Sequence, residues 1–309
     1  METANPQSKP AKRNRVRYYT TPGDHIFMFF IYVMLWASLV LVALPILFIF
    51  ASSFSSAEAI AAGRVMLWPV EFNTRGYEMI LKTSTIVIGY RNSLMYAVLG
   101  TMLNLVMTLL AAYPLSRKDF QGRNVVMVLL SITMFFNGGL IPTYLLVRGL
   151  GLLDTVGAMV IPVAMGVYNV IITRTFIQSN IPTELYESAS LEGCGDFHFL
   201  MRIVIPLSTP IIAVMALLYA VGHWNSYMNA ILYLKNPQLL PLQLILRDIL
   251  ILNMGIGSPN DVNKQLEMQY FSYLVRYSTI IVASLPVMII YPFVQKYFIK
   301  GIMIGALKG

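Results

Sequence analysis

Six stretches of this sequence contain no Asp, Glu, Lys or Arg and are each long enough to cross a bilayer. They lie within residues 26–57, 92–116, 124–147, 155–173, 203–234 and 277–295. A helix needs roughly 20 apolar residues, at about 1.5 Å each, to cross about 30 Å of hydrocarbon. The first and fifth stretches exceed that length, so we expect them to leave the membrane near Ser52 and Trp224. The sequence therefore predicts an all-α polytopic membrane protein with six spans, at about 26–52, 92–116, 124–147, 155–173, 203–224 and 277–295.

The composition excludes a water-soluble enzyme. The 309 residues are 57% hydrophobic and 12% charged, with a mean hydropathy of +0.67, whereas soluble domains carry about 25% charged residues. The single cysteine, Cys194, allows no intrachain disulfide, and the three scattered histidines have no metal-ligand spacing. We therefore expect no metal site and no catalytic residues.

Two shorter apolar runs, 236–246 and 249–260, are separated by Arg247 and Asp248. Each is too short to span, and burying a charge at the membrane centre costs about 3 kcal/mol. We interpret them as loop or surface helix, with a re-entrant segment as the alternative.

Lysine and arginine in the short loops predict the orientation of the chain. They cluster in the N-terminal tail, after the second span and in the C-terminal tail, at Lys9, Lys12, Arg13, Arg15, Arg17, Arg117, Lys118, Arg123, Lys296, Lys300 and Lys308. Positively charged short loops stay in the cytoplasm. We therefore expect a cytoplasmic tail at 1–25, a transmembrane domain at 26–295 and a cytoplasmic tail at 296–309, with no cleaved signal peptide and with the long loops at 53–91 and 225–276 outside. The net charge of +8 then reflects topology and not a nucleic-acid partner.

The six apolar stretches lack the ionisable residues that mark proton relays and ion sites. Only His223 falls within them, at the outer end of the fifth span. The chain also has no G-x-x-x-x-G-K-[ST] phosphate loop. If this is a pump, ATP and Mg²⁺ bind to another polypeptide. A self-sufficient secondary carrier or channel for a small polar solute, and an integral membrane enzyme, remain as alternatives.

Amide and phenol side chains supply the polarity within the spans. Such groups hydrogen-bond neighbouring helices, and they also suit a hydroxyl-rich ligand without needing charge. Both interpretations stay open for the candidate pathway residues Asn104, Asn137, Tyr168, Asn169, Tyr219 and Asn225. The Asn137-Gly138-Gly139 triplet, followed by Pro142, interrupts the third span, and such a break is tolerated only where protein or a cavity covers the backbone.

An acidic segment lies between the fourth and fifth spans, where the positive-inside rule favours cations. Pro182 and Thr183 favour a helix start, Glu184 and Glu187 suit the positive end of its dipole, and Gly193 is a natural terminator. We expect a cytoplasmic helix at about 183–193. It is either an interfacial connector or a docking helix that offers carboxylates to a partner.

The segment resembles the EAA motif of bacterial ABC importer permeases, E-A-A-x-x-x-G followed by I/L-x-L-P. The matching residues are Glu187, Ser188, Ala189, Gly193, Ile205 and Pro206. Ser188, Glu192, Cys194 and Ile205 depart from the usual residues by small or conservative changes. Further resemblance to the carbohydrate permeases of the MalG type, and among them to the LplC/YtcP-like branch, lies in 111–117, 137–143 and 300–309.

This resemblance implies a type I ABC importer permease fold with cytoplasmic termini in the bacterial cytoplasmic (inner) membrane. The implied partners are a second homologous permease, a dimer of ABC ATPase subunits that carries ATP and Mg²⁺, and an extracytoplasmic solute-binding protein. The 183–193 helix would be the coupling helix, with Glu187 pairing with a basic ATPase residue, and Lys308 and Gly309 would contact the ATPases. The substrate would be an oligosaccharide, either a uronate such as an alginate or pectin fragment or a neutral glycan.

Overall fold

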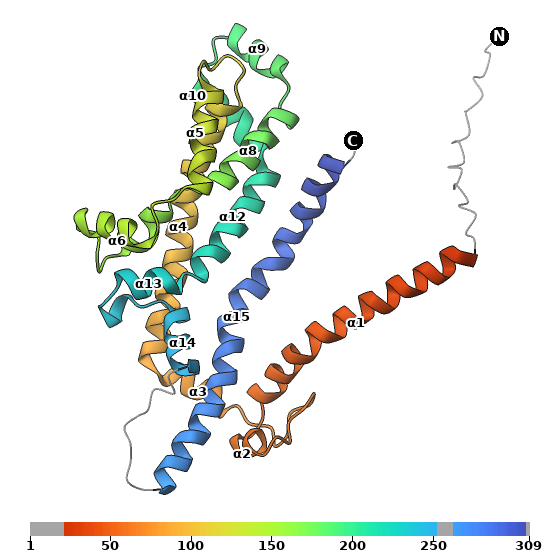
Figure 1. Ribbon diagram of the computed structural model, residues 1–309, viewed down its shortest axis with the longest axis vertical. Coiled ribbons are helices and arrows are strands. Elements are labelled where there is room, and N and C mark those ends of the chain that lie inside the picture. The colour runs from red at the N-terminus through yellow and green to blue at the C-terminus, as the bar shows by residue number, and fades with distance from the viewer. Residues whose placement is uncertain (1–21, 252–261, 307–309) are drawn as a thin grey trace, which may run out of the picture. The chain divides into compact units, whose positions relative to one another are not determined.

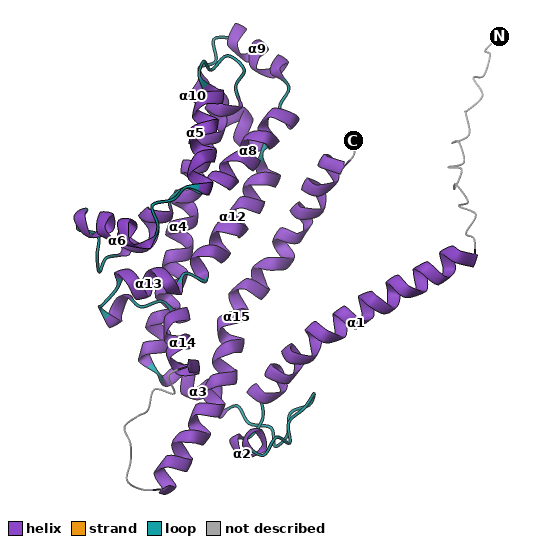
Figure 2. Ribbon diagram, in the orientation of Figure 1, coloured by secondary structure: helices purple, strands orange, loops and turns teal. Residues whose placement is uncertain are grey.

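The computed structural model describes residues 22–251 and 262–306, and every regular element within these ranges is helical (Figure 2). The chain divides into two units, residues 1–48 and 49–309. The elements shown in Figure 1 are α1 (Pro22–Ser53), α2 (Ala57–Ala61), α3 (Arg75–Lys82), α4 (Ser84–Ser116), α5 (Arg123–Phe135), α6 (Leu140–Gly149), α7 (Val156–Val160), η1 (Ile161–Val163), α8 (Val167–Asn180), α9 (Thr183–Leu191), α10 (Asp196–Phe199), η2 (Leu200–Val204), α11 (Ile205–Leu207), α12 (Thr209–Trp224), α13 (Tyr227–Tyr233), η3 (Pro237–Leu239), α14 (Leu242–Ile251) and α15 (Val262–Ala306).

The first unit consists, in its described part, of α1 up to Phe48. This helix is apolar on every side, and none of the side chains in its most apolar window is buried. A helix of this kind is typical of a membrane span, because lipid solvates all of its faces.

In the second unit, α4 is the central helix and packs against α8, α12 and α14. Its C-terminal end lies with α9 and α10, and its N-terminal end lies with α3 and α14 (Figure 1). A helix of 33 residues is about 50 Å long, so α4 exceeds the hydrocarbon thickness. It begins eight residues before the predicted span at 92 because Arg91 marks the edge of the apolar stretch, not the start of the helix.

Three helical segments are long and apolar enough to span a membrane: α1, α4 and Ser272–Pro292 of α15. Three bent pairs meet the same test, α5 with α6 at 112°, α7 and η1 with α8 at 52°, and the segment Asp196–Leu207 with α12 at 82°. The described chain thus has three candidate spans, or up to six if each bent pair is one span. The three bent segments contain the predicted spans at 124–147, 155–173 and 203–224.

Each bend coincides with residues that disfavour a continuous helix. The first lies at the predicted Asn137–Gly139 interruption, where Gly139 has a φ of +80° and the Asn137 side-chain oxygen accepts a hydrogen bond from the Gly139 amide at 3.0 Å. Pro162 and Gly166 flank the second bend. Pro206, Ser208 and Pro210 lie at the third.

The two predicted external loops contain short helices. The 53–91 segment forms α2, α3 and the start of α4, and α13, η3 and α14 follow α12. Of the two shorter apolar runs, 236–246 forms η3 and the start of α14, and the described start of the second run, up to Ile251, completes α14. Residues 252–260 of the second run lie outside the described residues.

Candidate functional site

The predicted cytoplasmic segment forms α9, which is amphipathic. Glu184, Glu187, Ser188 and Leu191 are exposed, and their spacing places them on one face of the helix. Leu191 has 91% of its surface exposed. Ala189 lies on the other side and is buried with Phe199, Leu200 and Val204 in a hydrophobic cluster that also contains the end of α4.

The helix ends through its glycine. Gly193 has a φ of +78°, the left-handed conformation that favours glycine after a helix C-terminus. The Gly193 amide donates to the Ser190 carbonyl at 3.0 Å, and the Cys194 amide donates to the Ala189 carbonyl at 2.9 Å. The predicted helix at 183–193 is therefore α9 followed by the Glu192 cap and a turn that leads the chain into α10.

Arg117, the residue after α4, joins this helix to the membrane-spanning part of the chain. Its guanidinium carbon lies 3.1 Å from the centre of the Tyr186 ring on α9. It donates to the Asp196 carboxylate of α10 at 3.1 Å and to the Tyr113 hydroxyl of α4 at 3.1 Å. The same guanidinium donates to Asp119, at 2.8 Å from Nε. We call Arg117, Tyr113, Tyr186 and Asp196 the Arg117 junction.

Electrostatics keep the Arg117 junction charged. The Arg117 side chain is only 13% exposed, and this burial works to lower its pKa. The hydrogen bonds to Asp119, Tyr186 and Tyr113 more than offset burial and raise the pKa. The hydrogen bond from Arg117 also lowers the pKa of Asp119, so both partners stay ionised at neutral pH.

Two further bonds attach α8 to the same end of α4. Arg174 donates through Nε to the Leu115 carbonyl at 2.8 Å, and Gln178 donates to the Ser116 carbonyl at 3.2 Å. A cavity of about 790 Å³ lies between the end of α4, α8 and α9, with Glu187 in its lining. The end of α4, the end of α8 and the first turns of α9 thus line one cavity.

Of the remaining residues predicted for the motif, Ile205 is half-buried and Pro206 is exposed. Ile205 packs against the same hydrophobic cluster as Ala189, and Pro206 lies in the first turn of α11. Lys308 and Gly309 lie outside the described residues.

Of the predicted pathway set, Tyr219 lines one membrane-depth pocket and Asn169 lies close to Gly166 in the same lining. The Tyr219 hydroxyl is 2.7 Å from the Thr108 hydroxyl, and it accepts a hydrogen bond from the Gly166 amide at 3.3 Å. Gly166, Tyr219 and His223 line a pocket of about 400 Å³. Asn169 is half-buried close to Gly166, and its neighbour Tyr168 is exposed.

Asn104 differs from this group. It is 1% exposed, its amide donates to the Val163 carbonyl, and its oxygen lies 2.6 Å from Nε2 of His223. Its side chain is therefore used between helices, and we leave it out of the pathway. Asn137 is exposed in the α5–α6 bend, and Asn225 is exposed at the end of α12, where it lines a different pocket, described below.

Comparisons with known proteins identify the family. The polygalacturonan/rhamnogalacturonan transport system permease protein YtcP of Bacillus subtilis is 38% identical over 295 residues, which cover 93% of this chain and 99% of that protein. The chain is a permease subunit of a carbohydrate ABC importer. This permease is also 38% identical to the protein LplC of the same organism, over 86% of this chain and 89% of that one. The sequence matches no family model.

A solved structure agrees. A chain of a bacterial ABC transporter involved in the import of the acidic polysaccharide alginate superposes with a TM-score of 0.84 at 32% identity, and the match covers 91% of this permease and 99% of that chain. The permease therefore belongs to a binding-protein-dependent importer of oligosaccharides or polysaccharides in a bacterial membrane, and ATP is hydrolysed on a partner ATPase. This excludes the alternatives of a self-sufficient carrier and a membrane enzyme.

Sequence reasoning missed three residues of this permease. Arg117 lies in the 111–117 segment that carries the family resemblance, but its sequence gives no indication of its contacts with Tyr186 and Asp196. His223 is read from the sequence as an isolated histidine, and its partner Asn104 is 119 residues away. Arg247 is noted only as a charge that interrupts an apolar run.

Proposed function

We propose that α9 is the coupling helix of this permease and docks into an ATPase subunit through Glu187 and Leu191. The observation that carries the proposal is the division of the helix into two faces. One face presents carboxylates and a fully exposed leucine, and the other packs onto the end of α4. An exposed apolar side chain beside charged groups is typical of a protein interface.

The Arg117 junction supplies the mechanical connection. A displacement of α9 by a closing ATPase dimer would act on Tyr186 and, through Arg117, on α4. The bonds from Arg174 and Gln178 would carry the same displacement to α8. Gly166, which lines the membrane-depth pocket, directly precedes α8, so a displacement of α8 would reach the edge of that pocket.

We further propose that the sugar pathway forms against a second, homologous permease and is lined by Tyr168, Asn169 and Tyr219, with Asn137 and Asn225 at its wider parts. Large apolar side chains are exposed along α4, α5 and the described part of α15, and lipid and a second permease are the two environments that cover such faces. A binding protein would deliver the sugar at the end of the permease where α3, α13 and α14 lie. Fragments of acidic glycans are the substrates that we favour, because the names of two relatives point to such polymers.

The test of the coupling proposal is Glu187→Lys, with Glu78→Lys as the matched control. Both glutamates are exposed, and Glu78 lies on α3, away from α9. We expect Glu187→Lys to reduce co-purification of the ATPase subunits and sugar uptake by at least about tenfold, because reversing one partner of an interfacial charge pair costs about 2–5 kcal/mol. The control should behave as wild type. Wild-type assembly and uptake in Glu187→Lys would overturn the proposal.

A further inference from the structure

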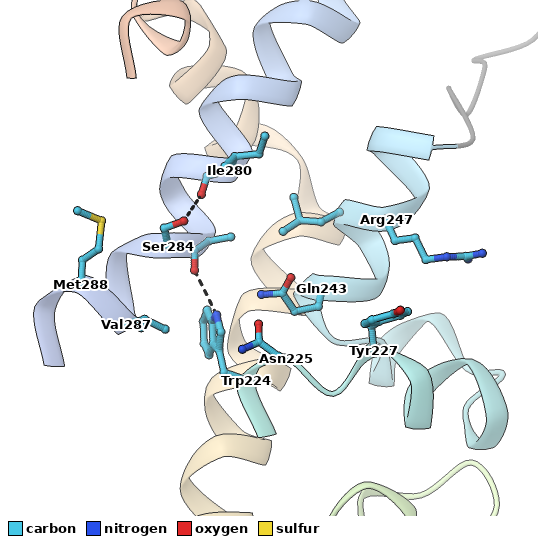
Figure 3. Close-up of a pocket in the computed structure, with 11 residues that line it drawn as sticks. Trp224, Asn225, Tyr227, Gln243, Arg247, Ile280, Ser284, Val287 and Met288 are labelled. Atoms are coloured by element: carbon cyan, nitrogen blue, oxygen red, sulfur yellow. Dashed lines mark hydrogen bonds between the residues drawn. The ribbon is translucent and has the colours of Figure 1, made fainter. Parts of the chain in front are cut away.

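A further cavity, of about 630 Å³, lies between the end of α12, α14 and α15 (Figure 3). Its volume falls within the range of about 300–1,000 Å³ that is usual for small-molecule sites. The lining carries two aromatic rings, two primary amides, a hydroxyl and a guanidinium, on Trp224, Tyr227, Asn225, Gln243, Ser284 and Arg247. No carboxylate is among the described residues that line it.

One wall of the cavity is rigid. The buried Trp224 indole donates to the Ala283 carbonyl at 3.2 Å and stacks edge-on against Tyr90, with ring centres 5.6 Å apart. The Ser284 hydroxyl donates to the Ile280 carbonyl at 2.8 Å. The Trp224 bond holds α12 against α15, and the Tyr90 contact fixes the Trp224 ring against α4.

The opposite wall carries two polar side chains that have no hydrogen-bond partner among the described residues. Within the described part of the chain, the side chains of Tyr227 and Gln243 make no hydrogen bond. Figure 3 shows Gln243 pointing toward Trp224 and Asn225, and Arg247 reaching outward from α14 on the side of Tyr227. Tyr227 is well exposed, so its ring offers a flat apolar surface beside the amide.

Arg247 adds a cation to this wall. It lies one turn after Gln243 on α14, and its side chain is 38% exposed. Its ion pair with the adjacent Asp248 uses NH1 at 3.4 Å, whereas a guanidinium has five N–H donors. The pair therefore leaves further N–H donors of the guanidinium available to a ligand.

The combination fits a sugar that carries a carboxylate. An aromatic ring packs against the C–H face of a pyranose, amides bond its hydroxyls, and a guanidinium binds a carboxylate through two parallel N–H···O bonds. We propose that this cavity is a binding site for a hexuronate unit and that Arg247 binds its carboxylate. The inference rests on the permease function and deepens the substrate proposal above.

The test compares trigalacturonate with its methyl ester, in which each carboxylate is replaced by an uncharged ester and the sugar hydroxyls are unchanged. Binding of each is measured to the complete transporter complex in nanodiscs, without binding protein, for wild type, Arg247→Gln and Arg247→Lys. The matched control is Arg148→Gln, because Arg148 is exposed on α6 and does not line the cavity.

We expect wild type to bind the acid at least about tenfold more tightly than the ester, the size of one hydrogen-bonded charge contact. Arg247→Gln should bring the ratio close to one, Arg247→Lys should give an intermediate ratio, and Arg148→Gln should keep the wild-type ratio. Equal binding of the two probes by wild type, or a wild-type ratio in Arg247→Gln, would overturn the proposal.

If Arg247→Gln fails to assemble, Arg247→Lys tests the proposal instead. A wild-type ratio of acid to ester binding in Arg247→Lys would overturn the two parallel hydrogen bonds from Arg247 to the carboxylate. ATPase co-purification should be unchanged in the Arg247 variants. Wild-type ATPase co-purification and uptake in Glu187→Lys would overturn the coupling proposal alone. An unchanged ratio of acid to ester binding in Arg247→Gln would overturn the hexuronate site alone, so the two failures are distinguishable.

Discussion

The guanidinium of Arg117 lies 3.1 Å above the ring of Tyr186, so the residue that ends the central helix α4 contacts α9 directly. The same guanidinium also donates hydrogen bonds to Tyr113, Asp119 and Asp196. Tyr186 in turn meets Phe199 edge-on, with ring centres 5.3 Å apart. Motion of α9 therefore has a short, nearly buried route to α4.

Replacing Arg117 should uncouple transport from ATP hydrolysis. In Arg117→Gln the cation–π contact and the ion pairs are lost, and a partly desolvated contact of this kind contributes about 2 kcal/mol. We expect the sugar transported per ATP hydrolysed to fall at least about tenfold while the ATPase still co-purifies. Arg117→Lys should recover part of the coupling, because it keeps the charge but not the planar fork.

The control for this prediction is Lys118→Gln, a neutralised cation at the adjacent, exposed position. It should leave the ratio of transport to hydrolysis unchanged. A proportional fall of uptake and hydrolysis in Arg117→Gln would show that Arg117 only supports assembly.

Asn104 should matter for stability and not for substrate affinity. Asn104→Leu leaves the buried His223 nitrogen without its partner at 2.6 Å, which costs about 1–3 kcal/mol. We expect a lower thermal midpoint of the purified complex and an unchanged KM for sugar uptake. The double variant Asn104→Leu with His223→Phe should recover much of the loss, because removing both polar partners leaves none unpaired. A raised KM would instead return Asn104 to the pathway.

Gly100 should not tolerate a larger side chain. A Cβ at this position would overlap the ring of His223, and overpacking of a core costs about 1–3 kcal/mol. We expect Gly100→Ala to lower the thermal midpoint, with Gly149→Ala as the control, since nothing lies within 4 Å of a Cβ there. Equal midpoints for the two variants would contradict the tight contact between α4 and α12.

Asp154 should make stability depend on acid pH. Its carboxylate accepts hydrogen bonds from the backbone amides of Asn236 at 2.8 Å and Lys235 at 2.9 Å, and these lower its pKa below 3.8. A lowered pKa means that the folded state holds the proton less tightly than the unfolded state. The stabilisation that the charged Asp154 gives the folded state is therefore complete above the pKa of the unfolded state. It is lost as pH falls through the pKa of the folded state.

Thermal midpoints measured from about pH 5 to below 3.8 should fall for wild type. Asp154→Asn isolates the charge, because asparagine also tolerates the φ of +59° at this position. We expect it to start from a lower midpoint at neutral pH and to show a shallower fall. The control is Glu58→Gln at an exposed position, which should keep the wild-type dependence of the thermal midpoint on pH. A fall of the midpoint in Asp154→Asn as steep as in wild type would contradict the prediction.

Local sequence was sufficient to predict the helical segments. The apolar stretches without charge overlap the candidate spans, and the Asn137–Gly139 triplet marks a bend of 112°. Pro182 and Gly193 bound α9 closely. These features depend on residues a few positions apart, where backbone preference and hydrophobicity decide the outcome.

Helix ends were harder to predict, because charges report where the hydrocarbon ends and not where hydrogen bonding stops. α4 starts before Arg91, and α15 runs from Val262 to Ala306, well beyond the predicted span at 277–295. The sequence also could not separate a pathway asparagine from one that links helices. For Asn104, burial and the hydrogen bonds to Val163 and His223 favour the linking role.

The sequence by itself determined that this chain is a helical membrane protein with an acidic helix between two apolar stretches, because low charge and hydrophobic length act locally and do not depend on the fold. The tertiary structure alone decided which polar groups meet. Arg117 and Asp196 are 79 residues apart, and Arg247 shares a cavity with Trp224 and Ser284 only because α12, α14 and α15 pack together. Such contacts arise from helix packing, which no spacing along the chain encodes.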